Sequence, residues 1–161
     1  MTRTKTLLSC VLLSALLVFG CGGDADDNSD EFVYPNQEDA PAELVGIWVF
    51  RSVTVNGAEQ ALADVMEWQP TSFEARLSIA SWGACGFSEV DSRGEQTTRE
   101  SCIVFVEGNE MDFQFLSPDG RTVVEELATT FTLSGGTLTI TTVEEGDTIV
   151  FTLNMSMNQR T

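Results

Sequence analysis

The chain has 161 residues, and its 25 carboxylates against eight basic residues give a formal net charge of −17. This balance disfavours nucleic acid as a partner, because its binding depends on contacts between cationic side chains and phosphates. The sequence has no histidine, and its one lysine is Lys5. These absences exclude Ser-His-Asp and Cys-His catalysis, the P-loop lysine and histidine zinc sites. We therefore expect neither an enzyme nor a bound cofactor or metal.

Carboxylate-only catalysis, as in glycoside hydrolysis, is the chemistry that the composition leaves open. Adjacent acids occur at Glu125-Glu126 and Glu144-Glu145. Neighbouring residues of a strand point to opposite faces, so this spacing does not form a paired-carboxylate site. Solvated charges at strand edges are the preferred interpretation.

The first twenty residues have the pattern of an export signal. Arg3 and Lys5 precede an apolar run from Leu7 to Phe19, and a cationic start before a short apolar stretch is typical of secretory signals. A transmembrane helix needs roughly 17–25 apolar residues, which this run does not reach. We expect residues 1–20 to be removed.

The end of this run, Val18-Phe19-Gly20-Cys21, resembles the lipobox of bacterial lipoproteins. The resemblance implies that Cys21 is acylated and that its acyl chains anchor the protein to a membrane of the cell envelope. Gly22 stands where an aspartate often retains such lipoproteins in the inner membrane, so the outer membrane is expected. The alternative is an ordinary signal peptide cleaved nearby, which the lack of a small-x-small site disfavours.

Residues 21–43 follow as an acidic segment with eight carboxylates and no base. Such a segment cannot bury enough apolar surface to offset its ordering entropy, so we expect a disordered linker behind the acylated cysteine. Asp24 and Asp26 alternate as in a calcium loop. However, Ser29 and Pro35 stand where an EF-hand needs glycine and glutamate, so no structured metal site is expected.

From residue 44 to residue 161 the sequence predicts a single all-β domain. Apolar and polar residues alternate in runs such as 73–79 and 111–115, which is the pattern of half-buried strands. Turn signals such as Asn56-Gly57 separate the runs. Short antiparallel strands at this spacing predict a barrel or a sandwich. We expect about eight strands, near residues 44–55, 71–80, 84–92, 98–107, 110–117, 121–133, 137–144 and 148–157.

One segment of the domain departs from this alternation. Leu62, Val65 and Met66 share a face at helical spacing, and Pro70 stops the run. We expect one short helix over residues 58–68, capping one end of the barrel.

The cysteines predict one disulfide. Cys10 lies in the signal and Cys21 in the lipobox, which leaves Cys85 and Cys102 as an even pair in an oxidising compartment. A bridge between them would stabilise the fold by about 3 kcal/mol in the chain-entropy model. The alternative is a redox pair of free thiols, which the 16 residues between them disfavour, since redox pairs have Cys-x-x-Cys spacing.

Two segments, Leu44-Val45-Gly46-Ile47-Trp48 and Phe131 to Ile140, resemble the opening and the last third of bacterial lipocalin-like domains. The resemblance implies an antiparallel calycin-type barrel of about eight strands. It also implies that Gly46 permits close packing and that Trp48 plugs the barrel base. The stretch 81–87 departs from the family pattern, so a ligand does not follow from the resemblance.

Two non-catalytic functions fit such a barrel, and we expect a monomer for both. The first is the binding of a small hydrophobic ligand, since an eight-stranded barrel is either just filled by side chains or holds one small molecule. The candidate lining residues are Phe73, Leu77, Phe113, Phe115, Phe131, Ile140 and Phe151. The second is an envelope interaction or structural protein with a solid core. Its loops 81–97 would contact a protein or glycan partner through exposed Trp82 and Phe87.

Overall fold

The computed structural model describes residues 39–66 and 74–156. The signal, Cys21, most of the acidic linker and Phe73 therefore lie outside the described residues. The described elements follow one another as β1 (Gly46–Val55), β2 (Ala58–Gln60), α1 (Leu62–Val65), β3 (Glu74–Ile79), β4 (Ala84–Val90), β5 (Gln96–Glu107), β6 (Glu110–Leu116), β7 (Val123–Ser134), β8 (Thr137–Glu144) and β9 (Asp147–Met155).

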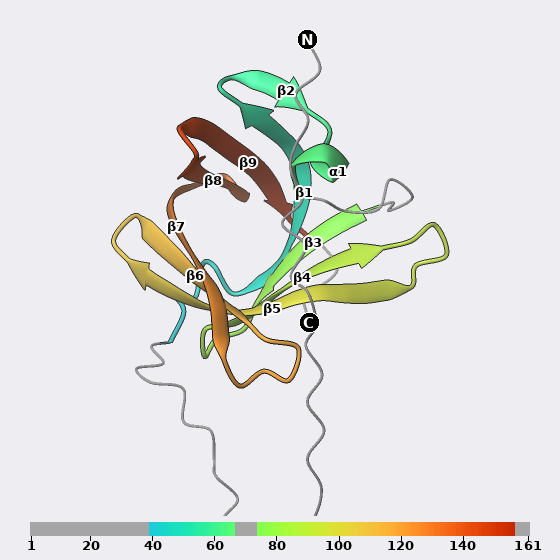
Figure 1. Ribbon diagram of the computed structural model, residues 1–161, viewed down its shortest axis with the longest axis vertical. Coiled ribbons are helices and arrows are strands. Elements are labelled where there is room, and N and C mark those ends of the chain that lie inside the picture. The colour runs from blue at the N-terminus through green and yellow to red at the C-terminus, as the bar shows by residue number, and fades with distance from the viewer. Residues whose placement is uncertain (1–38, 67–73, 157–161) are drawn as a thin grey trace, which may run out of the picture. The chain divides into compact units, whose positions relative to one another are not determined.

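Eight of these strands close into an antiparallel barrel. β1 pairs with β3, each later strand pairs with the next, and β9 pairs back onto β1. Figure 1 shows the strands arranged around a common axis. Residues of one parity face the interior, as on β3, where Ala75, Leu77 and Ile79 are buried. The predicted all-β barrel of about eight strands is confirmed.

The helix predicted over residues 58–68 is wrong in extent. Asn56 and Gly57 have φ values of 51° and 79°, and positive φ at both central residues matches a type I′ hairpin. The turn therefore continues β1 into β2, whose residues 58–60 pair with 53–55 of β1. Within residues 58–66, the described part of that range, the helical residues are those of the single turn α1, Leu62–Val65. Within the described ranges no helix has the length and apolarity to span a membrane.

The ordered barrel domain begins before Leu44, where the disordered linker was predicted to end. The side chain of Ala40 is buried, and its N–H donates to the carbonyl of Ser81 at 2.9 Å. The N–H of Leu44 donates to Pro41 at 2.8 Å. These bonds hold residues 40–44 against the barrel. The acidic composition of the segment did not predict this, because the contacts come from one small apolar residue and a turn.

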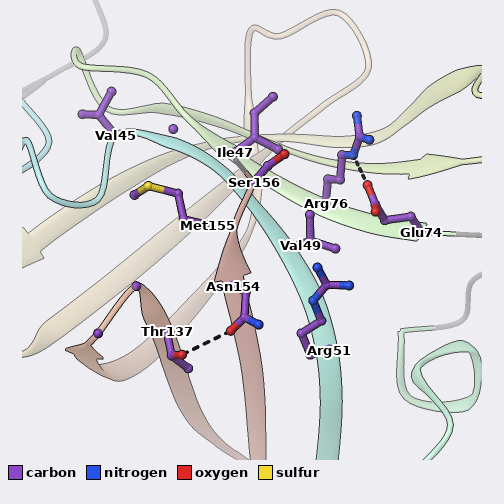
Figure 2. A pocket seen from close by; sticks show the side chains of 13 residues that line it. Val45, Ile47, Val49, Arg51, Glu74, Arg76, Thr137, Asn154, Met155 and Ser156 are labelled. Carbon is purple, nitrogen blue, oxygen red and sulfur yellow. Dashed lines mark hydrogen bonds and ion pairs between the residues drawn. The ribbon is translucent and has the colours of Figure 1, made fainter. Parts of the chain in front are cut away.

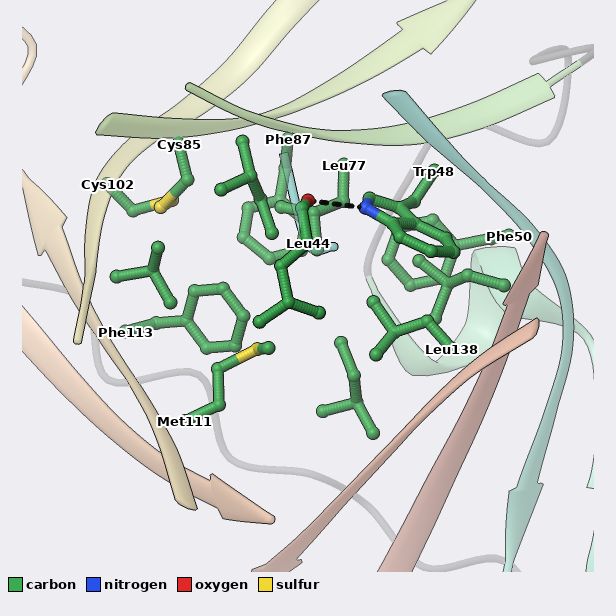
Figure 3. Close-up of a cluster of buried hydrophobic side chains, with 14 of the residues drawn as sticks. Leu44, Trp48, Phe50, Leu77, Cys85, Phe87, Cys102, Met111, Phe113 and Leu138 are labelled. Atoms are coloured by element: carbon green, nitrogen blue, oxygen red, sulfur yellow. Dashed lines mark hydrogen bonds between the residues drawn. A yellow bond between two sulfur atoms is a disulfide. The ribbon is translucent and has the colours of Figure 1, made fainter. Parts of the chain in front are cut away.

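Leu44 and Trp48 fill the barrel at the end where β1 starts. Both side chains have no exposed surface, and Figure 3 shows Leu44 at the centre of the buried cluster. Trp48 is a core plug, as expected. The expected close packing at Gly46 is wrong: a Cβ there would meet nothing within 4 Å. Its φ of 146° is the reason for glycine, since side chains disfavour that conformation.

The disulfide between Cys85 and Cys102 is confirmed. The two residues are direct cross-strand partners on β4 and β5, with Cα atoms 4.8 Å apart. Both are buried in the core cluster, as Figure 3 shows. The bridge therefore ties two barrel strands together inside the wall.

Hydrogen bonds join Asn56, in the turn after β1, to Asp147 and Thr148 at the start of β9. We call this contact the clasp, and it lies at the seam where β1 pairs with β9 and closes the barrel. The Asn56 Nδ2 donates to Asp147 Oδ1 at 2.8 Å, and Asn56 Oδ1 accepts the N–H of Thr148 at 3.0 Å. The backbone N–H of Asn56 also donates to the carbonyl of Thr148, at 2.8 Å. The clasp joins residues 91 and 92 positions apart in the chain.

Candidate ligand-binding site

The barrel interior contains a cavity of about 380 Å³ next to the packed core. Strands β1 and β4–β9 contribute to its wall, and Val65 and Met66 contribute from the end of α1 and just beyond it. Its apolar lining consists of Phe50, Val65, Met66, Phe87, Phe113, Phe115, Leu127, Ile140 and Phe151. Its polar lining consists of Glu100, Glu125, Thr129, Thr142 and Glu144.

Four of the predicted lining residues meet at this cavity: Phe113, Phe115, Ile140 and Phe151. Leu77 is fully buried in the core and does not line it, and Phe131 packs against the core from its edge. The wall also includes Phe50 and Phe87, which were not among the predicted residues. Their sequence signal was present, because Phe50 is two residues beyond Trp48, and Phe87 two beyond Cys85, on strands that alternate.

The aromatic rings of the wall pack against one another. The ring centroid of Phe87 lies 5.6 Å from those of Phe113 and Phe115. Phe50 meets Phe151 edge-on at 5.7 Å. These separations lie in the range of favourable aromatic pairs. The contacts fix the wall of the cavity before any ligand is present.

The placement of Phe87 corrects the predicted interaction surface. Phe87 lies on β4, faces the interior and is 7% exposed, so it is not an exposed loop residue. The cause is the strand Ala84–Val90, whose seven residues lie within the segment 81–97 that was predicted to present contact loops. Trp82 remains exposed on the preceding turn.

The two buried hydroxyl groups of the wall are satisfied by the backbone. Thr129 Oγ1 donates to the carbonyl of Met111, and Thr142 Oγ1 donates to that of Ala128 at 3.2 Å. Because each hydroxyl is already bonded within the barrel, neither adds an unpaired donor to the cavity. The threonines therefore leave the aromatic and aliphatic side chains as the binding surface of the deep part of the wall.

Three glutamates add negative charge to the same wall. Glu100 lies opposite Phe87 in the β4–β5 register, Glu125 lies opposite Phe115, and Glu144 lines the cavity from β8. All three are exposed, which places them where the cavity meets solvent. Burial and then the charge of Glu125 raise the pKa of Glu100.

The adjacent acidic pairs thus divide between two faces. Glu125 lines the cavity, whereas Glu126 accepts a hydrogen bond from Gln114 at 2.9 Å and does not line it. This agrees with the expected strand alternation, but Glu125 and Glu144 are cavity residues as well as edge charges. In the described part of the chain, no three His, Cys, Asp or Glu residues are grouped to hold a metal ion.

A second hollow lies on the outer face of the barrel where β1 adjoins β3 and β9, with a volume of about 720 Å³ (Figure 2). Arg51 and Arg76 project into it, and Arg76 forms an ion pair with Glu74. Thr137 donates to Asn154 at 3.2 Å along the same edge. This outer hollow is larger and has a mixed lining, with Val45, Ile47, Val49 and Met155 beside the two arginines, but it lacks the aromatic wall of the inner cavity.

Comparisons with known proteins give structural similarity only. No family model matches the chain, and no curated protein matches it. A lipocalin-like protein from Bacteroides uniformis is similar with a TM-score of 0.45 and 17% identity over 68% of this chain and 97% of that one. The extracellular fatty acid binding protein As-p18 gives 0.45 and 9% over 74% and 100%. Fatty-acid-binding protein 1 of Echinococcus granulosus gives 0.39 and 11% over 70% and 97%.

Proposed function

We propose that the barrel binds one small hydrophobic ligand in its inner cavity and that it catalyses no reaction. The observation that carries this proposal is the aromatic-lined space of about 380 Å³ beside a fully packed core. Ligand sites are typically clefts of about 300–1,000 Å³ with mostly apolar walls and a few polar groups. The inner cavity has that size and that composition, whereas a solid-core barrel would have neither.

The packing of the aromatic rings in the cavity wall favours a binding function over a purely structural one. Phe50, Phe87 and Phe113 belong both to the core and to the cavity lining, so the cavity keeps its shape without an occupant. A preformed site loses less entropy on binding than one that must order its side chains. An apolar ligand would gain roughly 25 cal/mol for each Å² of apolar surface that it removes from water.

We also propose that the protein works as a lipoprotein of the bacterial cell envelope, at the outer membrane rather than the inner. The lipobox-like Val18-Phe19-Gly20-Cys21 and Gly22 support this. Two or more acyl chains on Cys21 would make attachment stable, since a single chain binds membranes only marginally. Cys21→Ser should move the protein from the membrane fraction to the soluble fraction, and a protein that stays in the membrane would contradict lipidation.

The binding proposal can be tested on the chain from residue 21 onward, carrying Cys21→Ser and purified without detergent. The neutral dye N-phenyl-1-naphthylamine should gain fluorescence on entering the cavity. Leu127→Trp places a large ring in the cavity, while Ala128→Trp places it at an exposed position on the same strand. The first should weaken dye binding by about tenfold or more, which is ~1.4 kcal/mol, and the second should leave it nearly unchanged.

Two results would contradict the binding proposal. One is the absence of dye binding to the well-folded parent chain, with folding checked by circular dichroism. The other is an equal effect of Leu127→Trp and Ala128→Trp. Native mass spectrometry of protein taken from its own envelope adds an independent readout, since a retained small molecule is expected.

A further inference from the structure

We propose that the ligand is a cationic amphiphile, an organic ammonium with an apolar body. This inference rests on the proposed binding function and names the chemical class of ligand for the same cavity. The geometry points to it through three glutamates at the open side of a cavity whose inner wall is aromatic. The body would lie among the phenylalanines and the ammonium group beside the carboxylates.

The register of the strands places two of the three carboxylates next to an aromatic ring of the wall. Glu100 is the cross-strand partner of Phe87, and Glu125 is the partner of Phe115. Residues directly opposite on neighbouring strands have Cβ atoms about 4.5–5.5 Å apart on the same face. Two carboxylates therefore stand beside the rings that form the inner wall.

The aromatic wall is itself suited to a cation. An ammonium over a ring face within about 6 Å of its centroid is attracted by the ring quadrupole. The ring centroid of Phe87 lies within 6.2 Å of those of three other rings, Phe50, Phe113 and Phe115. A cationic group that entered from the carboxylates would meet these rings next, whereas an anionic group would be disfavoured by both.

No arginine of the described residues lines the cavity to balance the three carboxylates. The nearest in sequence is Arg99, which donates to Glu89 at 3.0 Å. Arg76 and Arg93 pair with other acids, and Arg51 lies at the outer hollow. A cleft lined by one sign of charge concentrates ligands of the opposite sign and speeds their entry.

The test compares three ligands with the same alkyl chain and different charge: decyltrimethylammonium, decanol and decanoate, each below its micelle concentration. Each displaces N-phenyl-1-naphthylamine from the Cys21→Ser chain at neutral pH. We expect decyltrimethylammonium to bind about tenfold or more tightly than decanoate, a difference of ~1.4 kcal/mol. Decanol should fall between them.

Two triple variants distinguish the effect of the cavity carboxylates on ligand preference from the effect of the net charge of the whole chain. The triple substitution Glu100→Gln, Glu125→Gln and Glu144→Gln should remove the preference for the cation. The matched control Glu107→Gln, Glu110→Gln and Glu126→Gln changes the net charge equally, at exposed residues that do not line the cavity. It should keep the preference.

The possible outcomes distinguish a failure of the cationic-ligand inference from a failure of the binding function on which it rests. If the dye and all three ligands fail to bind, the binding function is wrong. If decanol binds but decyltrimethylammonium binds no better than decanoate, the cationic ligand class is wrong and the binding function stands. Equal loss of preference in both triple variants would also overturn the inference, because net charge would then explain the selectivity.

Discussion

The indole Nε1 of Trp48 donates a hydrogen bond to the carbonyl oxygen of Leu44 at 2.8 Å inside the buried core. Both side chains are fully buried. The bond links the start of β1 to the segment that precedes it. The same tryptophan therefore fills the core and holds Leu44 in place before the first strand. A buried carbonyl without such a donor would carry a desolvation penalty.

Trp48→Phe should destabilise the barrel by about 1–3 kcal/mol, because the carbonyl of Leu44 loses its buried partner. The matched control is Trp82→Phe, since Trp82 is 50% exposed and surface changes usually cost within about 0.5 kcal/mol. Urea unfolding followed by circular dichroism measures both. Equal losses of stability in the two variants would contradict the role given to the Trp48 bond.

Removal of the disulfide should lower stability without changing the fold. Cys85 and Cys102 are 17 positions apart, and a loop of that size contributes about 3 kcal/mol in the chain-entropy model. The double variant Cys85→Ala and Cys102→Ala should lose about that much free energy of unfolding, melt at a lower temperature and become insensitive to dithiothreitol. A parent protein whose melting temperature is the same with and without reductant would refute the prediction.

Stability should respond to the ionisation of Glu100. Its pKa is raised above the ordinary value of 4.5 by burial and by Glu125, so the folded state binds this proton more tightly than the unfolded state. The penalty for ionised Glu100 is present above its folded pKa and is relieved as the pH falls toward 4.5. Glu100→Gln should therefore stabilise the protein at pH 7, by at most about 0.5 kcal/mol because the group is exposed.

The control is Glu126→Gln on β7, an exposed glutamate that does not line the cavity, and it should not reproduce the gain at pH 7. The gain from Glu100→Gln should vanish near pH 4.5. Asp91 and Asp119 do not interfere. Hydrogen bonds, chiefly from the Glu95 N–H to Asp91 and from Ser117 to Asp119, lower their pKa below 3.8. A gain from Glu100→Gln that is the same at pH 7 and pH 4.5 would rule out the proposed cause.

The strands could be predicted from the sequence because the alternation of apolar and polar residues is a local pattern. On β3, apolar and polar residues alternate in agreement with burial, and glycine-containing turns separate the runs. The stretch after Asn56-Gly57 was mispredicted because Leu62, Val65 and Met66 share a helical face. The tertiary pairing of residues 58–60 with β1 overrides that weak periodicity.

The cavity was only partly accessible from sequence. Alternation shows that Phe113 and Phe115 face inward, but the space left between opposing side chains depends on the shear and closure of the barrel. Glu100 has the same parity on β5 as the buried Cys102 and Val104, so its inward position follows from alternation. It was missed because an inward-facing position is expected to be apolar rather than charged.

Asn56→Ala should weaken the seam between the first and last barrel strands. It removes the side-chain bonds to Asp147 and Thr148 and places alanine at a φ of 51°. The expected loss is about 1–3 kcal/mol. Asn109→Ala, at an exposed turn position, is the control and should cost little. Thermal unfolding of the two variants measures the difference, and similar losses would argue against the clasp.

The same clasp joins residues that are synthesised at very different times. β1 leaves the ribosome long before Asp147 and Thr148 exist, so its exposed edge has no partner until almost the whole domain has followed. Closure then requires a loop of more than 90 residues, and topologies dominated by such distant pairings fold in roughly milliseconds to seconds. During that interval β1 presents unpaired N–H and C=O groups, an edge with which another chain could pair unless a chaperone shields it.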